Sequence, residues 1–232
     1  MASTLQTGDI AIIGINMDDP DKLTFVVLTN IDANTQIKFT DNGVTDQGTL
    51  KDNEGTWTWT ATNSVAAGTV ITLNSDMTAT TGTLTKSGAF ALSTSGDQIL
   101  AYQGDKTAPN YLYAVNVKGT AWQPDSLDTN SSALPPGLNN GTTAVALVEK
   151  DNVVYSGTTL GNKAALLSAI SNPANWTGDD SPNLTHATTN FAVTAGVDSQ
   201  APTLVSSNPT DESTGFGSTS NIVLNFNETI KV

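Results

Sequence analysis

The sequence predicts an all-β protein, a β-sandwich with one short helix, and two observations support this fold class. Apolar residues occur in short runs bounded by Gly, Asn, Asp and Pro, which is typical of strands and turns. A long series of such runs along 232 residues favours a sandwich or barrel. The chain has no cysteine, so an apolar core or bound cations must stabilise it in place of disulfides.

The alternation of apolar and polar residues defines the expected strands. Trp57 and Trp59, separated by Thr58, share one face of a strand, and core packing is the favoured interpretation over a sugar-binding aromatic platform. The predicted strands are Asp9–Ile15, Leu23–Thr29, Gln36–Thr40, Thr56–Thr60, Thr69–Leu73, Gln98–Gln103, Tyr111–Val117, Ala144–Val148, Val153–Tyr155 and Asn190–Val193.

One stretch, near residues 162–171, predicts a helix because Ala and Leu are dense there and form an apolar stripe. Asn162 is the expected N-cap and Pro173 the expected stop. A second short turn over 172–176 is expected to place Trp176 on the sandwich. This region is interpreted as a plug at one end of a sheet.

A change in pattern near residue 196 predicts a domain boundary. The expected division is a β-sandwich over 1–195, a linker over 196–202 and a second β unit over 203–232. In the second unit Ile222, Leu224 and Phe226 alternate with polar residues and share one face of a strand.

Charge limits the partners and the compartment. Nine basic residues, all Lys, stand against 22 acidic ones, giving a net charge of −13, which argues against nucleic acid or anionic membranes as partners. No apolar run approaches the roughly 18 residues of a membrane span, so membrane insertion is not expected. The remaining polarity comes from Thr, Ser, Asn and Gly, a composition common in secreted bacterial β proteins. The expected location is therefore extracellular or at the cell surface, with the export signal removed or placed beyond Val232.

Catalytic chemistry has little support in the sequence. Without Cys there is no thiolate nucleophile and no Cys-based zinc site, and a single His makes a Ser-His-Asp triad very improbable. His186 is expected to have only a surface or loop role. Nucleophile-elbow and phosphate-binding loop motifs are absent from the sequence. The fragment is therefore expected not to be an enzyme.

Several acidic loops contain candidate calcium ligands. Loops rich in Asp, Asn and Gly can supply the six to eight oxygens that Ca²⁺ requires, or their Asp and Asn can simply form turns. Asp18, Asp19 and Asp21 are candidate metal ligands in one such loop. Three further acidic stretches lie at residues 41–46, 52–55 and 179–180.

Two stretches resemble known bacterial modules. Residues 198–215, with an Asp-to-Ala-Pro entry and a Pro-anchored turn, and the strand Asn221–Glu228 resemble the start of an SbsA-type bacterial Ig-like domain. Such domains run to about 100 residues, so the unit is expected to be cut short at Val232 and to pack on the first domain, to be disordered or to be completed by another chain. The resemblance also implies a calcium site at the junction, with Asp198 and either Asp211 or Glu228 as ligands.

The first domain resembles the lamin-tail-like β-sandwich region of large secreted bacterial proteins, many of them cyanobacterial. The resemblance rests on Thr7–Gly14, Phe25–Leu28, Ile37–Gly43, Ser95–Gly104 and Asn172–Trp176. In those proteins such regions accompany phosphatase, nuclease or adhesin domains and are not known catalysts. The resemblance therefore implies a noncatalytic extracellular role.

Two functional hypotheses follow. The first is a structural or interaction module of a multidomain surface protein, calcium-stiffened and self-assembling, whose partners are the other domains of the polypeptide or other copies of itself. The second is a carbohydrate-binding accessory domain of a secreted phosphatase, nuclease or glycosidase. In that case an exposed aromatic such as Trp122 would contact a surface glycan.

Overall fold

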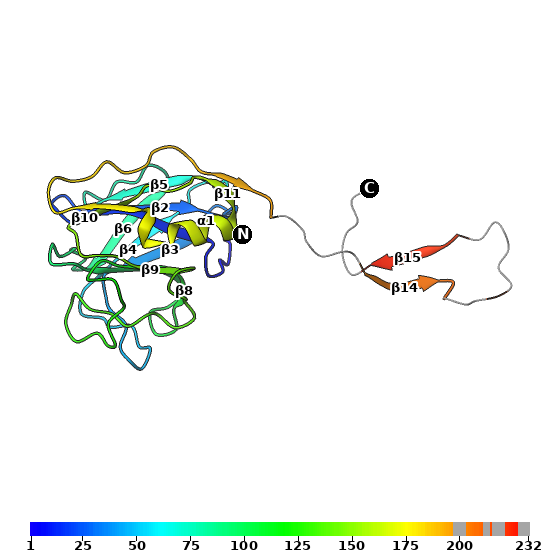
Figure 1. The fold of residues 1–232 in the computed structure, drawn as a ribbon, viewed down its shortest axis with the longest axis horizontal. Helices are drawn as coiled ribbons and strands as arrows, with labels where there is room; N and C mark the ends of the chain where they lie inside the picture. Colours follow the sequence, from blue (N-terminus) through cyan, green and yellow to red (C-terminus); the bar gives the residue numbers. More distant parts are fainter. Residues whose placement is uncertain (197–202, 211–213, 215–220, 227–232) are drawn as a thin grey trace. The chain divides into compact units, whose positions relative to one another are not determined.

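The computed structural model describes residues 1–196, 203–210, 214 and 221–226. The chain forms two compact units, Met1–Ala195 and Gly196–Val232. Figure 1 labels most of the helices and strands.

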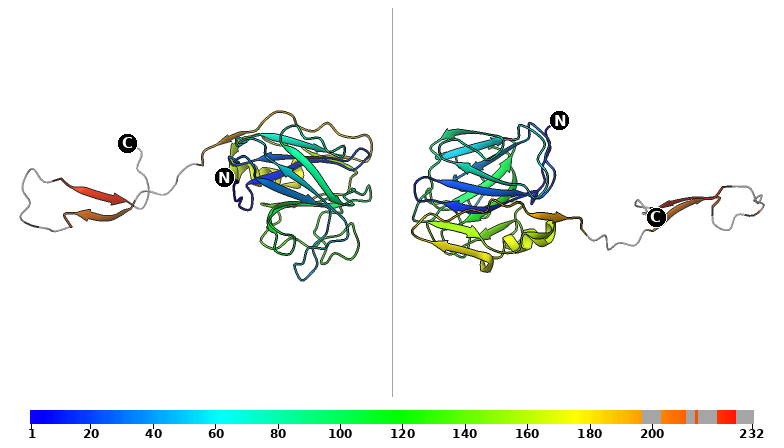
Figure 2. Two further views of the ribbon diagram at one scale, coloured as in Figure 1. Left: turned by 180° about the vertical axis from the view of Figure 1, so that it is seen from behind. Right: turned by 90° about the horizontal axis from the view of Figure 1, so that it is seen from above.

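The first unit is a sandwich of two large sheets that enclose one core (Figures 1 and 2). The five-stranded sheet has the order β12-β10-β1-β2-β5, and all its neighbours are antiparallel. Its strands are β1 (Ile10–Asn16), β2 (Lys22–Val27), β5 (Val70–Asn74), β10 (Asn152–Tyr155) and β12 (Trp176–Asp179).

The six-stranded sheet has the order β6-β4-β3-β7-β8-β9, in which only β8 and β9 are parallel. Its strands are β3 (Gln36–Thr40), β4 (Gly55–Thr60), β6 (Thr83–Gly88), β7 (Gln98–Gln103), β8 (Asn110–Asn116) and β9 (Ala144–Ala146). A short parallel pair, β11 (Leu160–Asn162) and β13 (Ala192–Thr194), lies beside the helix α1 (Lys163–Ile170).

Aromatic side chains from both sheets build the centre of the core. Trp57 and Trp59 of β4 are fully buried, and the intervening residues of this strand are half-buried, as the period of two predicts. Phe25 of β2 contacts Phe39 of β3, with ring centroids 4.9 Å apart, and meets the edge of Trp59 at 5.4 Å. Burying each such side chain contributes about 1.5–3 kcal/mol, so this cluster is a main source of stability.

Each predicted strand has a counterpart, with ends that differ by at most two residues, and the helix is confirmed. Asn162 is its N-cap, with a side chain that accepts the N–H of Ala165 at 2.9 Å. A 3₁₀ turn, η1 (Pro173–Asn175), follows it, and the half-buried Trp176 packs against the core as expected. Three strands were not predicted: β6 has one apolar residue that packs inward, Leu84, while β11 and β12 are short and mostly polar.

The expectation that His186 has a surface role is wrong. His186 lies in a loop, but the chain over 181–191 crosses the outer face of the five-stranded sheet and buries its ring. Nδ1 of His186 lies 2.6 Å from Oγ1 of Thr24 on β2. Burial lowers the pKa of His186 to about 4, helped by the charge of Lys22, so the ring is neutral in the folded protein.

A second, smaller apolar cluster lies on the outer face of the six-stranded sheet. Its centre is Leu100 and Tyr102 of β7 with Tyr111 of β8, and residues from the long connection between β8 and β9 cover it. The second unit contains the antiparallel pair β14 (Leu204–Asn208) and β15 (Val223–Phe226), whose apolar side chains are largely exposed.

Candidate functional site

Three buried carboxylates fix one connecting segment to the end of the sandwich. The segment, residues 89–93 and here called the strap, leads from β6 towards β7. Oδ2 of Asp41 accepts the N–H of Ala91 at 2.9 Å, Oδ2 of Asp21 that of Leu92 at 3.0 Å, and Oδ2 of Asp97 that of Ser93 at 2.9 Å. Three successive backbone N–H groups are thus satisfied by acids from three separate segments.

The same carboxylates hold further backbone groups. Oδ1 of Asp41 accepts the N–H of Gly55 at 2.9 Å, and Oδ1 of Asp97 accepts that of Gln98 at 2.8 Å. Burial raises the pKa of both Asp21 and Asp41, and the charge of Lys86 opposes part of this rise. Nζ of Lys86 also binds the carbonyl oxygen of Phe90 in the strap. Charge-assisted bonds of this kind are stronger than neutral ones, so these acids serve to anchor the backbone.

Burial also raises the pKa of acids in this region. Desolvation raises the pKa of Asp97 to about 8, and the charges of Glu54 and Asp41 add to this rise. Desolvation likewise raises the pKa of Glu54 to about 8, with contributions from Asp41 and Asp128 against the opposing charge of Lys51. Asp41, Glu54 and Asp97 are here called the carboxylate cluster.

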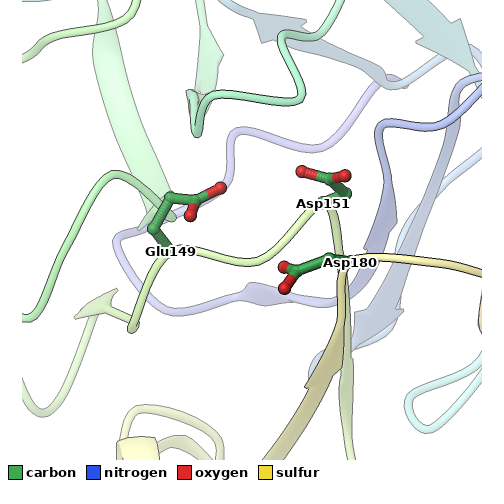
Figure 3. Close-up of side chains that lie close together, drawn as sticks. All are labelled: Glu149, Asp151 and Asp180. Atoms are coloured by element: carbon green, nitrogen blue, oxygen red, sulfur yellow. The ribbon is translucent and has the colours of Figure 1, made fainter.

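A second acidic group lies at the surface, at one end of the five-stranded sheet (Figure 3). Oxygens of Glu149, Asp151 and Asp180 lie within 4.8 Å of one another, and the three residues are here called the acidic tip. β10 pairs with β12 up to Asn152 opposite Asp179, so Asp151 and Asp180 lie one position further along facing chains. Like charges at facing positions repel.

Lys150 compensates part of this repulsion. Its Nζ lies 2.6 Å from Oδ2 of Asp180, and Asp180 is the first cause of the raised pKa of Lys150. The pKa of Asp151 is raised by desolvation and by the charges of Asp18 and Asp180. Within the described ranges this is the one set of three carboxylates whose ligand atoms are all close enough to surround a cation.

The candidate ligands Asp18, Asp19 and Asp21 do not come together, and Asp19 is exposed to solvent. Oδ2 of Asp18 accepts a hydrogen bond from the side chain of Asn152 at 2.7 Å, near the acidic tip. Asp21 instead holds the strap. The other three predicted ligands, Asp198, Asp211 and Glu228, lie outside the described residues.

Trp122 is half-buried and packs against the smaller apolar cluster. Its indole N–H donates to Oδ1 of Asn140 at 3.2 Å, which ties together two parts of the connection between β8 and β9.

Sequence reasoning singled out the stretches that contain Asp41, Glu54 and Asp180, but not Asp97, Glu149 or Asp151. Asp97 directly precedes a buried strand, and Glu149 and Asp151 flank Lys150 in the turn between β9 and β10. An acid directly before a buried strand, or two acids in a short connection between strands, could have been identified as candidates from the sequence. Their partners come from distant parts of the chain, and no local pattern indicates them.

No helix in the described part of the chain is long and apolar enough to cross a membrane. A family model of a bacterial Ig-like domain matches residues 198–232, which supports the Ig-like part of the resemblance. No curated protein and no solved structure matches the chain.

Proposed function

We propose that the chain is a noncatalytic structural or interaction module of a bacterial surface or secreted multidomain protein. The observation that carries this proposal is the match of residues 198–232 to a bacterial Ig-like domain, directly after a compact β-sandwich unit. Ig-like domains typically connect and present other domains, so a sandwich in series with one fits a spacer or contact role.

The use of the buried acids supports the noncatalytic part of the proposal. A catalytic acid must face a substrate, whereas Asp21, Asp41 and Asp97 accept backbone N–H groups of the strap and its neighbours. Their raised pKa values thus have a structural cause, since such values also arise in buried structural networks.

Two experiments test the proposal. Antibody labelling or protease shaving of intact cells is expected to reach the protein, and protection until lysis would contradict surface exposure. The purified chain is expected to show no phosphatase, nuclease or glycosidase turnover above the buffer blank. Turnover that the Asp97→Asn variant abolishes would contradict the noncatalytic role.

Self-assembly and calcium binding are finer parts of the same proposal, and self-assembly can be tested directly. Light scattering across a range of concentrations is expected to show association that grows with salt, because salt screens the repulsion between chains of net charge −13. A constant monomer mass at all salt concentrations would remove self-assembly from the proposal.

A further inference from the structure

In the described part of the chain, Glu54 and Gln98 each have a buried acceptor oxygen that lacks a donor. Oε2 of Glu54 and Oε1 of Gln98 are both shielded from solvent and have no hydrogen-bond partner in the described part of the chain. Gln98 is fully buried, whereas Glu54 is half-buried. A buried acceptor without a donor is costly, and an ion or an ordered water molecule is the usual reason that one persists.

The orientation of the Gln98 amide is fixed. Its Nε2 donates to the carbonyl oxygen of Asp41 and to that of Thr129, the latter at 2.9 Å. Turning the amide over would set its oxygen against both carbonyls and lose both bonds. Oε1 therefore remains an acceptor that faces away from these two groups.

Glu54 and Gln98 lie beside the same two segments. Gln98 binds the backbone of Asp41 and Thr129, while the charges of Asp41 and Asp128 both act on the carboxylate of Glu54. The chain over 126–132 covers this place, and Nζ of Lys51 binds the carbonyl oxygen of Ser126 there. The strand register brings the two residues together, because Thr40 of β3 faces Thr56 of β4 on one side and Leu100 of β7 on the other, so Glu54 and Gln98 lie on the two chains that flank residues 41–42.

The surroundings favour a positively charged guest. Asp41 keeps its oxygens on backbone N–H groups, but its negative charge acts on Glu54, where the positive charge of Lys51 opposes it. Asp128 adds a carboxylate at the rim, where its side chain is 60% exposed to solvent and its Oδ2 lies 3.6 Å from Nζ of Lys118. Carboxylate and amide oxygens are the ligands that hard cations prefer.

We propose that a calcium ion binds between Oε2 of Glu54 and Oε1 of Gln98, with Asp128 at the entrance and Asp41 supplying the negative field. This site is separate from the acidic tip, where Lys150 already pairs with Asp180. The inference does not depend on the proposed surface role.

Calorimetric titration of the purified chain with CaCl₂, after removal of metals, tests the site. We expect one ion per chain with a dissociation constant of about 10⁻⁴–10⁻³ M, the range of extracellular calcium modules. The Glu54→Gln variant keeps the shape of the side chain and is expected to weaken binding by at least about tenfold, and Asp128→Asn by a few-fold, since a carboxylate ligand is lost in the first and only an exposed charge in the second.

A matched variant separates this site from the acidic tip. The double variant Glu149→Gln/Asp151→Asn removes two acids from the tip and is expected to bind calcium like the unchanged chain. Binding that survives Glu54→Gln, or that the tip variant abolishes, would overturn the proposal, and so would absence of binding at millimolar calcium.

A spectroscopic measurement keeps the test independent of variant stability. In the unchanged chain, calcium is expected to shift the NMR resonance of the Gln98 side-chain amide, with Mg²⁺ as the control cation. An amide resonance that stays in place at saturating calcium would overturn the assignment of Gln98 as a ligand.

Discussion

The carboxylate of Asp41 binds the backbone N–H of Ala91, fifty residues further along the chain, at 2.9 Å. Its other oxygen binds Gly55, so one fully buried side chain joins the end of β3, the start of β4 and the strap. An Asp can do this because an ionised carboxylate only accepts hydrogen bonds and has two oxygens to offer.

Replacing Asp41 with Asn is therefore expected to destabilise the fold. The amide keeps one acceptor oxygen but turns an NH₂ group towards a backbone N–H, which leaves a buried donor unsatisfied. We expect a loss of about 2–3 kcal/mol in the free energy of unfolding, measured by urea denaturation. The exposed Asp46→Asn variant is the control and should change little, and equal effects of the two variants would contradict the anchoring role.

Gly55 tests how closely the strap packs on β4. A Cβ atom added at Gly55 would lie 1.9 Å from the backbone N of Phe90. A backbone atom cannot relieve this clash by changing rotamer, as a side chain could. The Gly55→Ala variant is expected to lose about 1–3 kcal/mol or more, as overpacked sites do. At Gly196 an added Cβ meets nothing within 4 Å, so Gly196→Ala should melt like the parent.

When calcium is absent, the carboxylate cluster predicts a stability that falls as pH rises from about 4.5 to about 8. The folded protein holds protons on Glu54 and Asp97 up to about pH 8, while the unfolded chain releases them near the ordinary pKa of 4.5 and 3.8. Unfolding thus releases protons in this window, so the free energy of unfolding decreases as pH rises towards 8 and then levels off.

Thermal unfolding in EDTA between pH 7 and pH 9 measures this effect. The melting temperature is expected to fall by several degrees and the Glu54→Gln variant, which cannot titrate at that position, to show a smaller fall. Parallel profiles for the two proteins would mean that Glu54 is ionised in the folded state at neutral pH.

His186 predicts an opposite dependence in acid. Its pKa is about 4 when folded and 6.5 in the unfolded chain, so the unfolded state takes up a proton first as pH falls below 6.5. The full difference corresponds to about 3 kcal/mol of lost stability by pH 4. His186→Gln is expected to lose less stability than the parent between pH 6.5 and pH 4.5. A variant that loses as much would show that the buried ring does not cause acid sensitivity.

The first unit is expected to fold without the second. The two sheets, the helix and the main core belong to Met1–Ala195. A fragment of residues 1–195 should therefore melt within about one or two degrees of the full chain, since a loss of 1 kcal/mol would already shift the melting temperature by about 2–4 °C. A larger decrease, measured by circular dichroism, would show that the second unit contributes to the stability of the first.

The sequence by itself determined the local structure. Strand period, turn residues and the N-cap Asn162 depend on neighbouring residues, so the strands of the core, the buried Trp57 and Trp59 and the helix could be predicted. The polar strand β6 could not, because its pairing with β4 defines it and not its own residues.

Only the tertiary structure decided what the polar residues do. Asp18, Asp19 and Asp21 are neighbours in the sequence, yet Asp18 contacts Asn152 while Asp21 holds the strap. His186 is a loop residue, as expected, but only the fold shows that its ring is buried against Thr24 of β2. The physical reason is that desolvation, Coulomb interactions and hydrogen bonds act through space, whereas the sequence records neighbours along the chain.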